Sequence, residues 1–290
     1  PGLLRPATEW MHSRNTVAIV QHIRQNDKWS CGYRNLQMML SSVLPHLPTD
    51  HLYYQKVPHR QDQITIPSLR QIQRNMERSW MEGYDPRGAA HYKHKLVGKK
   101  VWIGAVEVSS TLAYWGIDSA VVQFIRCQES REVLPRFIRA YFHKNWGQGS
   151  HCPFCCQRRQ LDALKCAERI LAMSTTSLHS KSMNSIGESD KSCSCPALPL
   201  YLQWEGHSVT VVGIEGADNI LIFDPLKNQR PTKLLASKLV KKDTQVVLVT
   251  TFQSLSAGEQ RARQQVGAES RFVATAASQA VMRACGDKKK

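Results

Sequence analysis

The sequence has no long apolar run. No uninterrupted apolar stretch approaches the roughly 20 residues that a membrane-spanning helix requires. Residues 1–25 carry charges and histidines instead of the apolar core of a signal peptide. We therefore expect a soluble protein of the cytoplasm and nucleus, without a membrane partner.

Acidic residues are also few, because 23 Asp and Glu stand against 39 Lys and Arg, which gives a formal net charge of +16. Such an excess favours an acidic partner such as nucleic acid. The basic residues are scattered, however, with separate groups at 93–100, 238–242 and 288–290, and aromatic residues do not alternate with them as in a base-stacking surface. We expect at most a weak nucleic-acid association through the basic surface, and solvated faces are the alternative.

The nine cysteines do not form an even disulfide framework, so reduced thiols are expected. One cluster contains a CxxC pair, which supplies half of a tetrahedral zinc shell. A long low-complexity segment separates it from the last two cysteines, which favours free thiols. We therefore predict no metal and no cofactor, with a zinc site as the alternative for the cluster, whose members are His151, Cys152, Cys155, Cys156, Cys193 and Cys195.

Hydrophobic spacing in the N-terminal half predicts mainly helices. A helix beginning at Cys31 places four apolar residues at offsets 0, 3, 4 and 7 on one face, and prolines end it. A second helix is predicted within 66–83, and a third at 133–143. Alternation predicts strands at 101–108 and 119–125.

The C-terminal half predicts strands around one unusual segment. Residues 146–197 are Ser-rich apart from a short helical run, and we predict a largely disordered insertion. Strands at 207–214 and 220–223 form a hairpin, and a strand at 245–251 precedes a charged helix at about 256–282. The chain thus reads as one α+β domain over residues 1–290, without internal repeats.

Cys31 is the candidate nucleophile. A thiol attacks as its thiolate, and the unpaired N–H groups and positive dipole at a helix start favour that anion. Gly32 permits close approach of the backbone, while Trp29 is placed to shield the site from water and to contact substrate. A buried structural cysteine before a helix is the alternative.

A base and an orienting acid are also available. A cysteine protease of the papain type needs an imidazole to take the thiol proton and a third group to hold the imidazole. His207 begins one strand of the predicted hairpin and Asp224 ends the other. In a tight hairpin Asp224 lies opposite a position near Val211, so a small offset or bulge brings it to His207. A surface histidine and a turn-forming aspartate are the alternatives.

The oxyanion of acyl transfer needs N–H donors, commonly the backbone N–H of the nucleophile and a side-chain amide. Gln25 lies six residues before Cys31, a spacing like that in papain-like enzymes, and it is the preferred donor over Gln21 and Asn26.

Five stretches resemble one peptidase family, the one that contains the ubiquitin-fold-modifier proteases and a zinc-finger ubiquitin peptidase. They are DKWSCGYRNLQMMLSS (27–42), WMEGYDPRGA (80–89), VWIGAVEV (101–108), YLQWEGHSVTVVGIE (201–215) and ILIFDP (220–225). The resemblance implies a papain-like cysteine protease fold, in which a central antiparallel sheet faces the helix that carries the nucleophile.

The position of the acid distinguishes two branches of that family. The modifier proteases carry Asp-Pro immediately before the histidine, whereas here Glu205 stands two residues before His207 and an Asp-Pro follows 17 residues later. The resemblance therefore implies a deubiquitinase that hydrolyses polyubiquitin, with preference for lysine-63-linked chains. It also implies that Asp85 and Glu107 bind the arginines of the ubiquitin tail, because guanidinium groups pair with carboxylates.

Two other functions stay open. The first is a protease specific for the ubiquitin-fold modifier. The second is a non-catalytic module that binds ubiquitin or nucleic acid.

Overall fold

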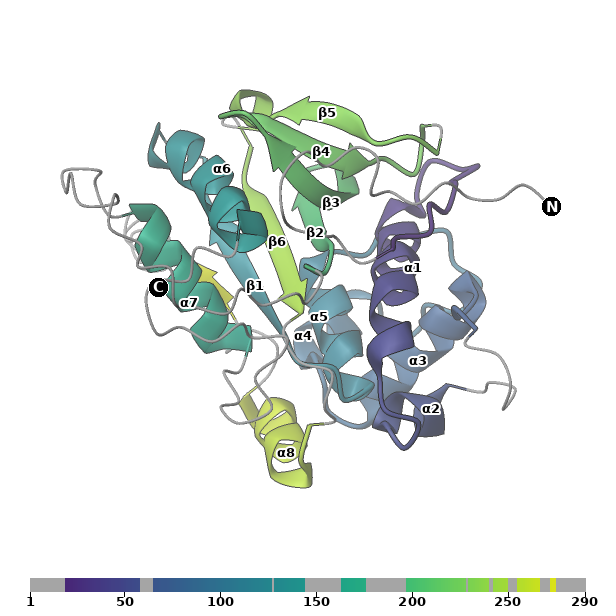
Figure 1. Ribbon diagram of the computed structural model, residues 1–290. Coiled ribbons are helices and arrows are strands. Elements are labelled where there is room, and N and C mark those ends of the chain that lie inside the picture. Colours follow the sequence, from purple (N-terminus) through teal and green to yellow (C-terminus); the bar gives the residue numbers. More distant parts are fainter. Residues whose placement is uncertain are drawn as a thin grey trace, which may run out of the picture.

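The computed structural model describes residues 19–57, 65–126, 128–143, 163–175, 197–227, 229–239, 242–249, 255–266 and 272–274. Within them, seven strands form one sheet in the order β5-β4-β3-β2-β6-β1-β7, antiparallel throughout except for the parallel pair of β1 and β7 (Figure 1). The strands are β1 (Ser119–Phe124), β2 (Leu200–Trp204), β3 (His207–Glu215), β4 (Asn219–Phe223), β5 (Thr232–Leu235), β6 (Thr244–Val249) and β7 (Phe272–Ala274).

Helices cover both faces of the sheet (Figure 1). They are α1 (Cys31–Val43), α2 (Leu52–Lys56), α3 (Leu69–Met81), α4 (Pro86–His91), α5 (Ala105–Tyr114), α6 (Gln128–His143), α7 (Ala163–Thr175) and α8 (Ala257–Val266), with 3₁₀ turns at Leu44–His46 and Ala236–Leu239. The predicted α+β class, with an antiparallel sheet facing the helix that begins at Cys31, is confirmed.

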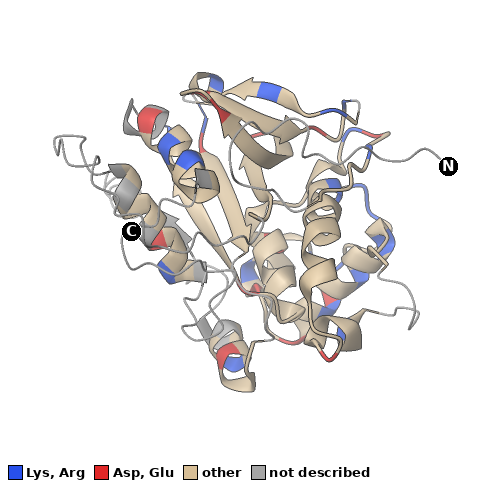
Figure 2. Ribbon diagram, viewed as in Figure 1, with Lys and Arg blue, Asp and Glu red and all other residues tan. Residues whose placement is uncertain are grey.

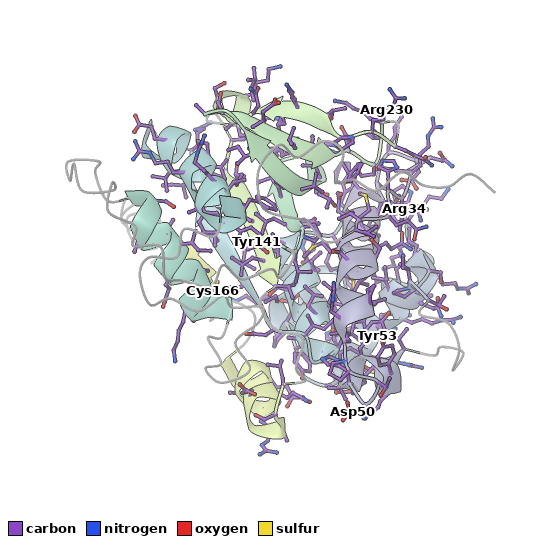
Figure 3. The ribbon with its side chains drawn as sticks, viewed as in Figure 1. Arg34, Asp50, Tyr53, Tyr141, Cys166 and Arg230 are labelled. Carbon is purple, nitrogen blue, oxygen red and sulfur yellow. The ribbon has the colours of Figure 1, made fainter. Side chains whose placement is uncertain are left out.

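The sheet separates two hydrophobic cores because successive strand residues point to opposite faces. In β1, Val122 packs into the core formed with α6 and α7, while Val121 packs into the core formed with α1, α3 and α5. Figure 3 labels Tyr141 and Cys166 in the first core and Tyr53 in the second. Burying each large apolar side chain contributes about 1.5–3 kcal/mol.

The four apolar residues predicted for the buried face of α1 are all in the second core, namely Leu36, Met39, Leu40 and Val43. Each is at most 1% exposed. The 3.6-residue period thus identified correctly which face of the helix meets the rest of the protein.

The strand predicted at 101–108 is wrong. Residues 101–104 lie outside any strand, and α5 begins at Ala105. The N–H of Gly104 donates to Glu107 Oε2 at 2.7 Å, so a carboxylate three residues on satisfies the helix start. Ala105, Val108 and Leu112 then form the buried face at helical spacing, which an alternating pattern over the first few residues conceals.

The helix predicted at 256–282 is also wrong in its extent. The structure has the short helix α8 and then the strand β7, in which Val273 pairs with Val122 of β1. The helical run within the predicted insertion is α7, whose Cys166, Ala167, Ile170 and Leu171 are buried in the core with α6. The rest of that segment, including the cysteine cluster, lies outside the described residues.

Charge is spread over the described surface. Figure 2 shows Lys and Arg on α3, on α6 and near β5, so they are not concentrated on one helix. In the described part of the chain, no helix has the length and apolarity needed to cross a bilayer.

Candidate active site

Cys31 is the first residue of α1, and the preceding Ser30 makes no side-chain cap. The first-turn N–H groups of a helix have no partner within the helix, and together with the dipole they favour an anion there. Only glycine fits at position 32, since a Cβ there would lie 2.7 Å from both Ile103 Cγ1 and Ile103 O. The backbone beside the nucleophile is therefore packed directly against residue 103.

Asp27 holds the loop that leads into α1. Its Oδ1 accepts the N–H groups of Trp29 at 2.9 Å and Ser30 at 2.8 Å, and its Oδ2 accepts the Ser30 hydroxyl at 2.8 Å. Burial raises the pKa of the Asp27 carboxyl, but these donors outweigh it and lower the pKa below its usual value. The start of the helix is thus fixed by a carboxylate that precedes it.

The β3–β4 hairpin brings His207 to Asp224. A register shift between Val211 and Gly213 makes Val211 pair with Ile222 and Thr210 with Phe223. Asp224 follows directly, and its Oδ1 lies 3.0 Å from His207 Nε2. Both residues are largely buried. The bulge that the sequence required for this contact is present.

Asp224 is itself held in place. Its Oδ1 also accepts the N–H of Leu226 at 3.0 Å, and its backbone carbonyl lies 3.1 Å from His22 Nε2. Because Asp224 occupies Nε2 of His207, Nδ1 is the ring nitrogen left for the thiol. Trp204 packs edge-on against the imidazole with 5.5 Å between ring centroids, which shields the ring from water.

Cys31 and His207 are hydrogen-bonded to each other, and this contact changes the pKa of both. Burial raises the pKa of the thiol, but the hydrogen bonds from His207 and Ser208 and the charge on His207 lower it below its ordinary value. Burial lowers the pKa of His207, but Asp224 and Cys31 raise it from 6.5 to about 9. The contact therefore favours the thiolate on Cys31 and the imidazolium on His207.

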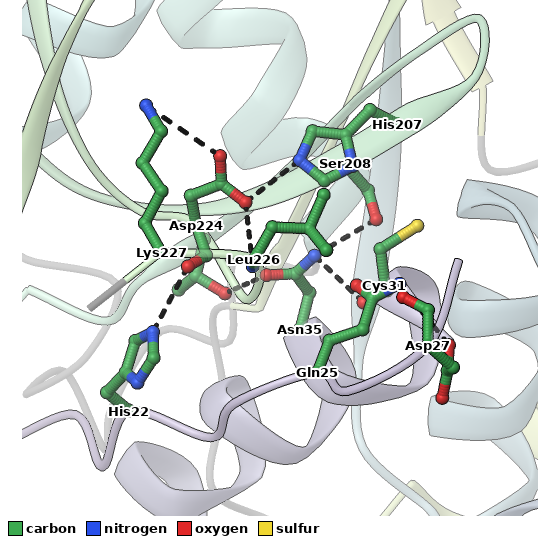
Figure 4. A network of polar contacts seen from close by, with 11 residues as sticks. His22, Gln25, Asp27, Cys31, Asn35, His207, Ser208, Asp224, Leu226 and Lys227 are labelled. Atoms are coloured by element: carbon green, nitrogen blue, oxygen red, sulfur yellow. Dashed lines mark hydrogen bonds and ion pairs between the residues drawn. The ribbon is translucent and has the colours of Figure 1, made fainter. Parts of the chain in front are cut away.

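A buried amide links α1 to β3. Asn35 Nδ2 donates to Cys31 O at 2.9 Å and to Ser208 Oγ at 3.0 Å, and Thr210 Oγ1 donates to Asn35 Oδ1 at 2.8 Å. Figure 4 shows Asn35 joined to Cys31 and Ser208, with His207 on the same strand as Ser208 and Asp224 just after β4.

Gln25 lies close to the helix start, but Asp27 engages its amide. Nε2 donates to Asp27 O at 2.7 Å, with a longer contact of 3.3 Å to Oδ1, and the side chain is buried. The backbone N–H of Gln25 donates to Pro225 O at 2.8 Å, which ties this segment to the turn after Asp224. Donation to an oxyanion requires the amide to exchange one of its contacts with Asp27.

Two tryptophans lie near the start of α1. Trp29 packs edge-on against Tyr33 with centroids 5.6 Å apart. Trp102 is 58% exposed, and its indole N–H donates to Lys28 O at 3.0 Å. These rings give the neighbourhood of Cys31 an apolar, partly open border.

The two acids predicted to bind the substrate tail each cap a helix. Asp85 is buried and precedes α4, and its Oδ1 accepts the Gly88 N–H at 2.9 Å. Glu107 caps α5 as described. Both acids help to raise the pKa of Tyr92, after the larger effect of burial, so they share one neighbour. After the larger effect of burial, Glu107 and Cys31 likewise both help to raise the pKa of Tyr201.

Sequence reasoning missed Asp27, Asn35, Ser208 and Thr210. Asn35 follows Cys31 by four residues, a spacing that places both on one helix face, and Ser208 and Thr210 alternate on one strand face. These spacings could have indicated that the three side chains lie near Cys31 and His207. The described residues contain no group of three or more His, Cys, Asp or Glu able to hold a metal ion.

The geometry suits nucleophilic acyl transfer, with a cysteine at a helix start and an imidazole held by a carboxylate. A model of peptidase family C78 matches residues 12–256. The chain belongs to peptidase family C78. This family is one of cysteine peptidases.

The relatives that this chain resembles in sequence are longer than it is. Zinc finger-containing ubiquitin peptidase 1 of Macaca fascicularis is 32% identical over 237 residues, which is 79% of this chain and 32% of the relative. The Bos taurus protein is 32% identical over 233 residues, or 78% of this chain and 31% of the relative. The chain therefore spans about a third of their length.

Two further similarities are more distant. Ubiquitin carboxyl-terminal hydrolase mug105 of Schizosaccharomyces pombe is 25% identical over 206 residues, or 71% of this chain and 63% of that protein. The crystal structure of UfSP from C. elegans covers 84% of this chain and 35% of its own, with 13% identity and a TM-score of 0.41.

Proposed function

We propose that this C78 peptidase is a deubiquitinase that hydrolyses polyubiquitin, with preference for lysine-63-linked chains. The observation that carries the proposal is the order of the catalytic groups. The acid in contact with His207 is Asp224, which follows β4, and it does not precede the histidine in an Asp-Pro-His arrangement. Two relatives that cover most of this chain are named as ubiquitin peptidases, which supports the same substrate.

In the proposed reaction the Cys31 thiolate attacks the carbonyl carbon of the isopeptide bond between the last glycine of ubiquitin and a lysine. The imidazolium of His207 gives its proton to the departing lysine amine, which leaves a thioester on Cys31. A water molecule then attacks the thioester and gives a proton to His207, and ubiquitin is released as the sulfur leaves, which restores the Cys31 thiolate and the His207 imidazolium. Asp224 holds the imidazole throughout.

Oxyanion stabilisation and tail recognition complete the proposal. The backbone N–H of Cys31 is one donor to the oxyanion and the amide of Gln25 is the other. Glu107 and Asp85 bind the arginines of the ubiquitin tail, and Trp29 contacts the tail near its glycines. Gly32 and Gly104 let the backbone beside Cys31 pack closely, because a Cβ at either glycine would meet neighbouring atoms within 3.1 Å.

Labelling with electrophilic probes tests the substrate. Ubiquitin and the ubiquitin-fold modifier, each carrying a C-terminal electrophile, are incubated with the protein and with Cys31→Ala. We expect the ubiquitin probe to label the protein at Cys31 and the variant to stay unlabelled. Labelling by the modifier probe alone would replace the proposal with a modifier protease, and no labelling by either would favour a binding module.

Chain linkage is tested separately with a panel of di- and tetra-ubiquitin. We expect lysine-63-linked chains to be cut fastest, with Cys31→Ala inactive on every linkage but still able to bind ubiquitin. Equal rates on all linkages would remove the preference and keep the deubiquitinase.

A further inference from the structure

Asn35 occupies an unusual place for a polar side chain, since it is fully buried on α1 one turn after Cys31. Its amide makes three hydrogen bonds, one to its own helix and two to β3, over a sequence separation of 173 residues to Ser208. A buried amide is costly unless its groups are paired, and an apolar residue would also pack a helix on a sheet. Unlike apolar packing, the hydrogen-bond network fixes the position of α1 relative to β3, because each bond needs its two atoms in a particular orientation.

The hydrogen-bond pattern limits where the Ser208 proton can go. Ser208 Oγ accepts from Asn35 Nδ2, so its single proton is directed to another acceptor. Ser208 acts to lower the pKa of the Cys31 thiol and also that of the Tyr201 phenol, so Cys31 and Tyr201 are the two acceptors beside it. The Tyr201 hydroxyl donates its own proton to Gln203 Oε1 at 3.1 Å. Thr210 in turn fixes the amide orientation, because its hydroxyl donates to Asn35 Oδ1 and so presents Nδ2 to Cys31 and Ser208.

We propose that Asn35 is a positioning residue for the nucleophile, which holds the first turn of α1 against β3 and orients the Ser208 hydroxyl as a donor to the Cys31 sulfur. The inference rests on the proposed thiol chemistry of Cys31 and His207. It does not depend on which modifier is cut.

The titratable groups around the sulfur stay unchanged in the variants that test this role. His207 on β3 acts on Cys31 directly, Asp224 acts through His207, and Cys31 and Glu107 both act on Tyr201 of β2. A change in the titration of Cys31 on altering Asn35 or Ser208 is thus due to the lost donor or the lost position.

The test measures the rate of iodoacetamide alkylation of Cys31 against pH, by mass spectrometry of the peptide that contains it. We compare the intact chain with Asn35→Ala, Ser208→Ala and Thr210→Val. The midpoint is the pH at which the alkylation rate reaches half of its maximum. Because a hydrogen bond to a charged group is lost, we expect this midpoint to rise by about one pH unit in Asn35→Ala and Ser208→Ala, with alkylation about tenfold slower below the midpoint. The shift in Thr210→Val is smaller.

Asn75→Ala is the matched control. Asn75 is also buried in a helix, and its Nδ2 donates to Gln71 O at 2.8 Å, four residues back, as Asn35 does to Cys31. It lies on α3, away from the nucleophile. We expect Asn75→Ala to lower the melting temperature and to leave the alkylation midpoint unchanged.

The outcomes separate this inference from the proposed function. A low midpoint in the intact chain that stays unchanged in Asn35→Ala and Ser208→Ala would overturn the positioning role alone. An ordinary thiol midpoint in the intact chain would overturn the proposed thiolate chemistry and this inference with it. If Asn35→Ala does not fold, Ser208→Ala and Thr210→Val, which change a few atoms each, decide the result.

Discussion

The helices α1 and α3 both have 13 residues and both follow a serine, but they use that serine in opposite ways. In α3, Ser68 Oγ accepts the Gln71 N–H at 3.3 Å, and Gln71 Oε1 accepts the Ser68 N–H at 2.8 Å, a complete capping box. In α1, the Ser30 hydroxyl donates to Asp27 and makes no cap. The N-terminus of α3 is capped by its serine, whereas the N-terminus of α1 has no serine cap and can stabilise an anion.

Packing explains how α1 tolerates this arrangement. A missing N-cap costs about 1 kcal/mol. Eleven of the thirteen α1 residues are buried, against six of thirteen in α3, so α1 is held by contacts along its whole length. The helix that faces solvent depends more on its cap than the helix that lies between the sheet and the other helices.

Replacing Asp224 gives the largest expected effect on the thiolate at the open helix start. In Asp224→Asn the imidazolium loses its anionic partner, and the first-turn N–H groups of α1 are left as the main support of the thiolate. We expect kcat/KM on a ubiquitin substrate to fall by about 10³–10⁴-fold.

Lys227→Ala is the control for Asp224→Asn, because Lys227 Nζ lies 3.9 Å from Asp224 Oδ2 and is exposed. We expect a change within about twofold, as for other surface pairs. A loss of less than tenfold in Asp224→Asn would mean that the helix start alone stabilises the anion.

The pH profile gives the next largest effect. The reactive form requires thiolate on Cys31, whose pKa is lowered, and a proton on His207, whose pKa is raised to about 9. The rate therefore rises with pH as the thiolate forms and falls as His207 loses its proton near pH 9, by tenfold per unit. The two groups titrate as a coupled pair, and kcat/KM against pH measures both limbs. An alkaline limb near the ordinary histidine value of 6.5 would contradict the ion pair.

The serines themselves give the smallest effects and separate the two kinds of helix start. Ser68→Ala removes a capping box, so we expect the free energy of unfolding in urea to fall by about 1 kcal/mol with kcat/KM unchanged. Ser30→Ala removes one contact to Asp27 and loosens the loop before Cys31, so we expect kcat/KM to fall by about fivefold with a smaller change in stability. The comparison fails if both variants change the same property.

The sequence was informative wherever one period or one spacing decided the structure. The apolar offsets of α1 predicted its buried face, and the alternation around residues 207–223 predicted the hairpin that carries His207 and Asp224. The alternation at 101–108 was misleading because Gly104 and Glu107 are the start of a helix, and three or four alternating residues fit both periods. Beyond 256, the charged composition did not indicate that residues 272–274 pair with β1.

The details of the site depend on contacts between distant segments, which no local pattern contains. The bulge between Val211 and Gly213 sets how close Asp224 comes to His207, and only the register determines it. Asn35 reads as an ordinary polar residue on a helix until β3 lies against it. The roles of Gln25, Asp85 and Glu107 stay predictions, because the contacts of each within the chain are compatible with a structural role.

The separation of 173 residues between Asn35 and Ser208 has a consequence for biosynthesis. The ribosome makes the α1 segment long before the β3–β4 hairpin, so a nascent chain carries Cys31 as an ordinary thiol without its imidazole. Reactivity arises only when the hairpin has emerged and docked. An incomplete chain therefore lacks the assembled pair of Cys31 and His207.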